Sequence, residues 1–152
     1  MRPAHGRQLR LLRRLGKPWA TAALAGIKGP CATHLASGRS LAVLEDLVQT
    51  GTLGLGVSAL EDLAEVKRAA RGRLALLGNL DGIAMRRWSA REAEAQVKAA
   101  IALAGRGGGW ILSDNHGEIP WQVPEEVLDA ISAAVHRWGR YPLDWIGGGA
   151  EP

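Results

Sequence analysis

Side chains that can bind ligands or carry protons crowd into residues 113–118, which read Ser-Asp-Asn-His-Gly-Glu. An imidazole changes charge near neutral pH, so His116 can donate a hydrogen bond to an acidic ligand or hold a proton beside it. Asp114 and Glu118 add carboxylates on either side, although a solvated loop would carry the same two charges. A turn alone does not require this set of side chains, so the pattern predicts a loop that contacts a ligand.

Two further polar groups follow apolar runs in the same way. Residues 78–82 read Gly-Asn-Leu-Asp-Gly, and His34 stands near the end of the run at 30–36. Asn79 and Asp81 are candidates for ligand contact, but Gly-Asn and Asp-Gly are also ordinary turn pairs whose side chains bind turn backbone. His34 is a candidate ligand contact or a hydrogen-bonded core histidine. The sequence leaves both alternatives open.

Four short apolar runs form the framework that must position these residues. They lie at residues 30–36, 53–57, 73–78 and 110–113. Each run is continuous rather than alternating, which is typical of buried strands in a parallel sheet covered by helices. The spacing leaves room for one helix after each run, so the sequence predicts an α/β fold of four parallel β/α units.

Capping residues mark the starts of the first three helices. Ser40 is expected to cap the helix after the first run. A Ser-x-x-Glu capping box is predicted at Ser58 with Glu61, and a second at Ser89 with Glu92.

The last helix is predicted between Pro124 and Gly139, with the proline at its first position. Apolar residues at helical spacing predict its buried face. That face is expected to contain Val127, Leu128, Ile131, Val135 and Trp138.

Right-handed β/α units leave two architectures, an open doubly wound sheet and part of a (β/α)8 barrel. In both, ligands bind at the carboxyl ends of the strands, where His34, residues 78–82 and residues 113–118 stand. The amino ends carry turn residues instead. The glycine cluster at 105–109 precedes a strand rather than following one, which argues against a dinucleotide-binding fold.

A metal site or a catalytic triad has weak support in the sequence. Cys31 and His34 have C-x-x-H spacing, but an odd separation along a strand directs two side chains to opposite faces. No second CxxC or HxxxH pair accompanies them, and no serine lies on a G-x-S-x-G turn. We therefore expect no metal.

Composition narrows the classes of partner. The 152 residues suit one domain, with 47% apolar residues, one cysteine and a net charge of +4. Residues 1–28 carry seven Lys or Arg and no acid, whereas residues 29–152 carry twelve against fifteen acidic residues. An acidic main part argues against a nucleic-acid partner. No apolar run reaches the roughly 18–20 residues of a membrane span, and one cysteine suits a reducing cytoplasm, so we expect a cytoplasmic protein.

The basic start, residues 1–27, is predicted to be a helical segment. Leu9, Leu12 and Leu15 fall on one face of such a helix, with arginines around it. This pattern is typical of a solvated amphipathic helix. An Arg-rich, acid-poor start also resembles an organellar transit peptide, and the sequence leaves that alternative open.

Two stretches resemble the C-terminal part of the uroporphyrinogen decarboxylase superfamily. They are LALLGNLDG at 74–82 and ILSDNHGEIPWQVPEEVLDAISAAVHRWGRYP at 111–142, while KGPCATHLASG at 28–38 is similar to an earlier strand. The superfamily includes the heme-pathway decarboxylase and cobalamin- or coenzyme-M-dependent methyltransferases. The resemblance implies the C-terminal half of a (β/α)8 barrel at 28–146, after the segment 1–27 and before a flexible tail at 147–152.

The resemblance also implies roles for residues of this chain. The decarboxylase works without a metal or organic cofactor on a tetrapyrrole with acidic arms, and His116 with Gly117 falls at the loop that contacts those carboxylates. Asp81 and His116 are then the expected catalytic residues. The expected substrate contacts are His34, Asn79, Gly117 and Glu118.

Most of the family's substrate-binding arginines and its central carboxylate belong to the N-terminal half of the barrel. The resemblance therefore implies that residues 28–146 alone are incomplete and inactive. It also implies self-association or pairing with a separate N-terminal half-barrel.

Some residues depart from the family pattern. Gly82 stands where the decarboxylase has proline, which implies a looser turn. The methyltransferase branch has His-x-Cys and a later cysteine that bind zinc, whereas here the positions read His34-Leu35-Ala36 and Asn115-His116. A methyltransferase that uses zinc, a corrinoid protein and a methyl donor stays as the alternative function.

Overall fold

The computed structural model describes residues 12–35, 38–114 and 118–147, which form an α/β fold around one parallel sheet. The strands are β1 (Ala32–His34), β2 (Gly54–Gly56), β3 (Ala75–Leu77) and β4 (Trp110–Ile111). They pair in parallel in the order β1-β2-β3-β4. Each strand falls inside its predicted apolar run, so the four parallel β/α units are confirmed.

Helical segments precede the first strand, connect the strands and follow the last one. They are η1 (Leu12–Gly16), α2 (Lys17–Ala25), η2 (Leu41–Val43), α3 (Leu44–Val48), α4 (Leu63–Ala70), η3 (Ala84–Arg87), α5 (Ala90–Ala104) and α6 (Glu125–Trp138).

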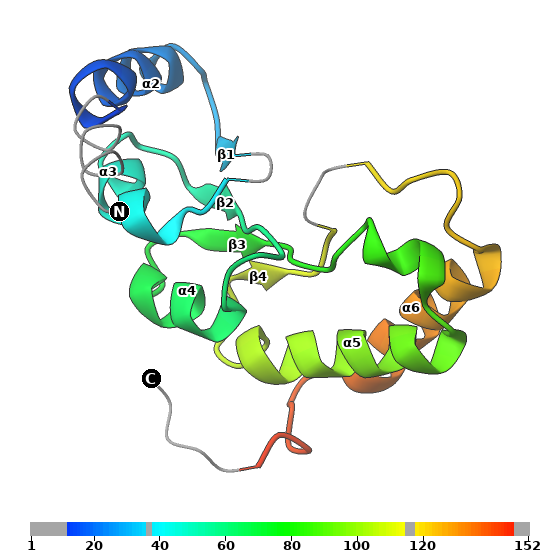
Figure 1. Ribbon diagram of the computed structural model, residues 1–152. Helices are drawn as coiled ribbons and strands as arrows, with labels where there is room; N and C mark the ends of the chain where they lie inside the picture. Colours follow the sequence, from blue (N-terminus) through cyan, green and yellow to red (C-terminus); the bar gives the residue numbers. More distant parts are fainter. Residues whose placement is uncertain (1–11, 36–37, 115–117, 148–152) are drawn as a thin grey trace, which may run out of the picture.

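The strand order distinguishes the two expected architectures. In a doubly wound sheet the order reverses at a switch point, and helices cover both faces. Here the order follows the chain without reversal, and right-handed crossovers in one direction put successive helices on one face. Figure 1 shows α4 and α5 along the same side of the strands. This arrangement is that of consecutive units of a (β/α)8 barrel.

The core lies between the sheet and these helices. Leu55 of β2 and Leu76 of β3 are fully buried and belong to one apolar cluster with Val66 of α4 and Val97 of α5. Burial of side chains of this size stabilises a fold by about 1.5–3 kcal/mol each.

The first strand was predicted to be buried, and this prediction is wrong. Ala32 and His34 are exposed, because β1 lies at the edge of the sheet and pairs only with β2 among the described strands. The neighbouring residues on β2, Gly54 and Gly56, are small. A Cβ on Gly54 would lie only 2.9 Å from the Cβ of Ala32, so no larger residue fits there.

The predicted capping box at Ser89 is confirmed. Its hydroxyl accepts the backbone N–H of Glu92 at 3.3 Å, and the Glu92 carboxylate accepts the Ser89 N–H at 2.7 Å. The box predicted at Ser58 is wrong, because α4 begins later, at Leu63. Asp62 caps it instead by accepting the N–H groups of two first-turn residues.

Helix α6 differs from its prediction in two details. It begins at Glu125, so Pro124 is the cap residue rather than the first helical residue. Its most buried side chains are Val127 and Ala134 at 0% and 2% exposure, whereas the predicted core residues Leu128 and Val135 are more than a third exposed. The buried stripe is therefore centred away from those two residues.

The N-terminal helix α2 has no buried residue. Charge instead ties this region to α3, because Arg13 and Lys17 bind the Asp46 carboxylate at 2.7 Å and 3.3 Å. Leu15 is 50% exposed, while Leu9 lies outside the described residues. Within the described residues, no helix has both the length and the apolar character needed to cross a bilayer.

Candidate functional site

The loop after β3 is tied to its neighbours through Asn79. The Asn79 amide donates to the carbonyls of Ser58 at 3.1 Å and Glu61 at 3.2 Å, both in the loop after β2. Gly78, at φ 130°, lies so close to Val57 that a Cβ would meet its carbonyl oxygen at 2.7 Å. Only glycine satisfies both the backbone conformation and the close approach.

Asp81 forms the Asx turn that was the alternative to a direct ligand contact. Its Oδ1 accepts the backbone N–H groups of Ile83 and Ala84, both at 3.0 Å. These bonds hold the entry into η3. The turn is therefore established. A catalytic role for Asp81 stays a prediction, and its Oδ2 is the oxygen that would carry out that role.

The loops after β1 and β2 are joined by the carboxylate of Glu61, which was expected to take part in a helix-capping box. Glu61 accepts the Ser40 hydroxyl at 2.7 Å and the backbone N–H groups of Ser40 and Leu41, both at 2.8 Å. Ser40 is 0% exposed. It stands at the predicted cap position, but its hydroxyl is a donor to Glu61 and makes no cap bond.

His34 ends β1 and lies over the neighbouring strand. It pairs in register with Gly56, and a Cβ on that glycine would fall 2.4 Å from the His34 ring. The glycine thus makes room for the imidazole. His34 is exposed, so the alternative of a core histidine is wrong.

Asp114 lies beside the loop at 78–82, as expected for two neighbouring strand ends. It forms a parallel bridge with Leu80, and a Cβ on Gly82 would lie 3.3 Å from its Oδ2. Glu118 is exposed. The predicted residues His116 and Gly117 lie outside the described residues.

A hollow of about 370 Å³ opens beside these loops, between residues 79–81 and α5. Its walls include Asn79, Asp81, Trp88 and Gln96. This volume is near the lower end of the roughly 300–1,000 Å³ typical of small-ligand pockets. Trp121, four residues after Gly117, is 89% exposed and thus not part of the core.

No cluster of three or more His, Cys, Asp or Glu side chains suited to a metal occurs in the described part of the chain. Cys31 precedes β1, and its thiol donates weakly to the Gly29 carbonyl at 3.6 Å.

Comparison with known proteins shows the family of this chain. The sequence model for uroporphyrinogen decarboxylase (URO-D) matches residues 9–138. The uroporphyrinogen decarboxylase of Pectobacterium carotovorum is 34% identical over 97 residues, and that of Erwinia tasmaniensis is 36% identical over 97. Each alignment covers 64% of this chain but only 27% of the relative.

A solved methyltransferase from Methanosarcina mazei superposes with a TM-score of 0.73 at 20% identity. The superposition covers 87% of this chain and 38% of the methyltransferase. At this identity the likeness establishes the fold alone.

Proposed function

Because the chain belongs to the uroporphyrinogen decarboxylase family, we propose that its carboxyl edge forms one wall of a pocket for a carboxylate-bearing tetrapyrrole. The observation that carries this proposal is the approach of Asp114 to Gly82, which brings the two most family-like loops together. Parallel β/α folds bind ligands at this edge. The exposed positions of His34 and Glu118 on the same edge suit contact with a ligand.

In this proposal the two loops have different tasks. Asn79 and Asp81 hold the wall through hydrogen bonds to backbone groups of nearby segments. His116 and Gly117 contact the carboxylate arms of the substrate. Loss of CO2 leaves an electron pair on the carbon that carried the carboxylate. A proton must then bind to that carbon through this electron pair. A protonated His116 is the group of this loop suited to give that proton.

We further propose that the chain does not decarboxylate this substrate alone. The curated relatives are matched over only 27% of their length, and the carboxylate of Glu61 at this edge is occupied in joining loops. The test is anaerobic incubation of purified chain with uroporphyrinogen under reducing conditions, followed by chromatography of the products. Sustained formation of coproporphyrinogen would overturn the inactivity that we propose.

A methyltransferase function is the second candidate, since the structural neighbour carries that name. It would require zinc, a corrinoid protein and a methyl donor. Elemental analysis separates the two functions. Stoichiometric zinc that is lost in His34→Ala and His116→Ala would favour methyl transfer, whereas metal-free protein would favour the decarboxylase-type wall.

The partner that we propose is a second copy or a separate N-terminal half-barrel. The outer edges of β1 and β4 have no strand partner within the described residues, and Ile111 on β4 is 56% exposed. Open strand edges of this kind favour pairing. Light scattering of the purified chain distinguishes a stable monomer, which would contradict self-association, from a defined oligomer. The proposed compartment is the cytoplasm, as the single cysteine suggests.

A further inference from the structure

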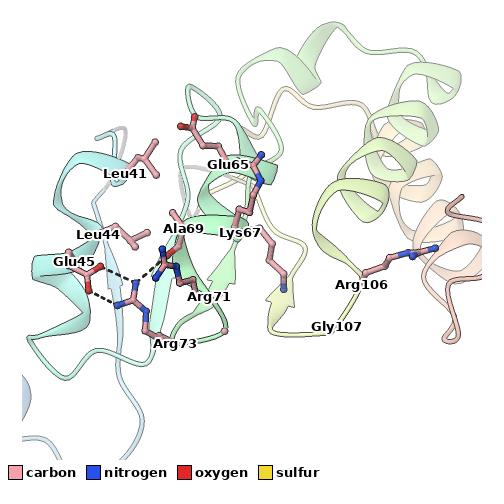
Figure 2. Close-up of a pocket in the computed structure, with 12 residues that line it drawn as sticks. Leu41, Leu44, Glu45, Glu65, Lys67, Ala69, Arg71, Arg73, Arg106 and Gly107 are labelled. Carbon is pink, nitrogen blue, oxygen red and sulfur yellow. Dashed lines mark hydrogen bonds and ion pairs between the residues drawn. The ribbon is translucent and has the colours of Figure 1, made fainter. Parts of the chain in front are cut away.

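A second and larger hollow, of about 1020 Å³, lies at the opposite edge of the sheet. Figure 2 shows its walls, which come from α3, from the end of α4 and from the turn after α5. Gly72 and Arg73 precede β3, and Gly107 precedes β4, so this hollow faces the amino ends of the strands. It is therefore separate from the loops at 78–82 and 113–118.

Positive charge dominates the lining of this hollow. Its cations are Lys67, Arg68, Arg71, Arg73 and Arg106, against two carboxylates, Glu45 and Glu65. The guanidinium of Arg73 pairs with Glu45 through two hydrogen bonds, the longer of them 3.0 Å. That pair cancels one charge of each sign, so the rest of the lining carries four cations and one carboxylate.

Two of the remaining arginines are not used by the fold. Arg68 and Arg71 are exposed, and neither belongs to an ion pair within the described residues. The hydrogen bond from Arg73 is the main cause that lowers the pKa of Glu45. The charge of Arg71 lowers this pKa further, so its electric field acts on the lining of the hollow. An anion entering the hollow would meet both guanidinium groups.

The backbone of Arg71 supports a functional role for this side chain. It ends α4 in the left-handed conformation, at φ 50° and ψ 38°, where glycine is the usual residue. Gly72 follows, also at positive φ, and a Cβ there would meet nothing within 4 Å. Non-glycine residues in such a strained conformation cluster at binding sites, and Arg71 is one of them.

Lys67 adds a partly buried cation to the same hollow. Its ammonium donates to the carbonyl of Gly108, a neutral acceptor, and burial lowers its pKa. Desolvation disfavours the charged form, and a bound anion would favour it again. A negative ligand beside Lys67 would therefore stabilise its charged form.

We propose that this basic hollow binds a small molecule that bears several phosphate groups. Guanidinium groups form two parallel hydrogen bonds with phosphate oxygens, and each phosphate supplies close to two negative charges. A concave site of this volume favours a compact ligand over a flat acidic protein face. The proposal is independent of the decarboxylase-type wall, because no charged residue of the hollow belongs to the loops at 78–82 and 113–118.

Calorimetric titration with inorganic tripolyphosphate at constant ionic strength tests this proposal. We expect one saturable site per chain, and about a tenfold weakening when Arg68→Ala or Arg71→Gly removes one guanidinium. Arg91→Ala is the control, because Arg91 is an exposed arginine on α5 outside the hollow. It should leave the affinity unchanged.

Arg71→Gly carries a second readout that a merely structural arginine would not give. Glycine relieves the left-handed strain, so the melting temperature without ligand should rise by about 2–4 °C while binding weakens. Unchanged affinity in Arg68→Ala and Arg71→Gly, or an equal loss in Arg91→Ala, would overturn the proposal. So would binding of polyglutamate without binding of tripolyphosphate, because that result would identify a protein-docking face.

Discussion

The Glu61 carboxylate holds the loop around Ser40, 21 residues earlier in the chain, by accepting its hydroxyl at 2.7 Å and its N–H at 2.8 Å. A third bond comes from the N–H of Leu41 at 2.8 Å. Glu61 also accepts the Asn79 amide through its backbone carbonyl. One residue thus fixes the loops that follow three successive strands, and these loops form the proposed wall.

Removal of this carboxylate should destabilise the protein. Glu61→Ala leaves two backbone N–H groups and a buried hydroxyl without their acceptor, so we expect a loss of about 2–4 kcal/mol in the free energy of unfolding. Glu61→Gln keeps one acceptor oxygen and should lose less. Urea denaturation measures both changes, with Asp129→Asn on the exposed side of α6 as the control. Equal stability of Glu61→Ala and the control would contradict this structural role.

Gly78 should tolerate no side chain. Gly78→Ala must adopt φ 130° and bring its Cβ to 2.7 Å from the Val57 carbonyl, so we expect a loss of roughly 2–4 kcal/mol. Gly107→Ala is the matched control, because it also has positive φ but no atom near the added Cβ. It should cost about 1 kcal/mol. Thermal unfolding compares the two, and similar losses would show that the contact with Val57 does not matter.

The Glu92 carboxylate should make stability depend on acid pH. Backbone and side-chain hydrogen bonds from Ser89 lower the pKa of Glu92 below its ordinary value of 4.5. The folded state therefore binds this proton less readily than the unfolded state. The stability that the ionised Glu92 carboxylate contributes is complete above pH 4.5. It is lost as the pH falls through the lower pKa of the folded state.

The measurement is the melting temperature of the protein and of Glu92→Gln between pH 3 and 7. The melting temperatures of the two proteins should converge below pH 4.5 as the Glu92 carboxylate is protonated. A constant difference across this range would show that the ionised carboxylate contributes nothing.

Local patterns predicted the strands and one capping box well, because those features depend on residues close in sequence. The four apolar runs contain all four observed strands, and Ser89 with Glu92 forms its box three residues apart. The same local rule failed at Ser58. There Asp62 was available as a cap nearer the helix, and Glu61 found donors across the fold.

The candidate site was predictable only as a location. Strand direction alone placed His34, Asn79, Asp81 and Asp114 at one edge, and all four lie there. The pattern could not show that Asn79 and Asp81 bind backbone, because the same dipeptides serve turns and ligands. The exposure of His34 also escaped prediction, since nothing in a short apolar run indicates an edge strand.

The basic hollow had no signal in sequence. Its charged residues come from three segments, at 45, 65–73 and 106. Separately, each resembles the solvated face or the end of a helix. Only the packing of α3, α4 and the turn after α5 brings them to one concave surface (Figure 2).

Amide NMR during an anaerobic titration with uroporphyrinogen tests the central claim most directly. If the carboxyl edge is one wall of a tetrapyrrole pocket, amide shifts should change at residues 78–82 and 113–118. Residues 67–73 of the basic hollow should stay unchanged. His116→Ala should weaken these changes by about tenfold, since it removes one charge-assisted contact with a carboxylate. Shifts confined to residues 67–73, or no shifts at either loop under saturating ligand, would contradict the account.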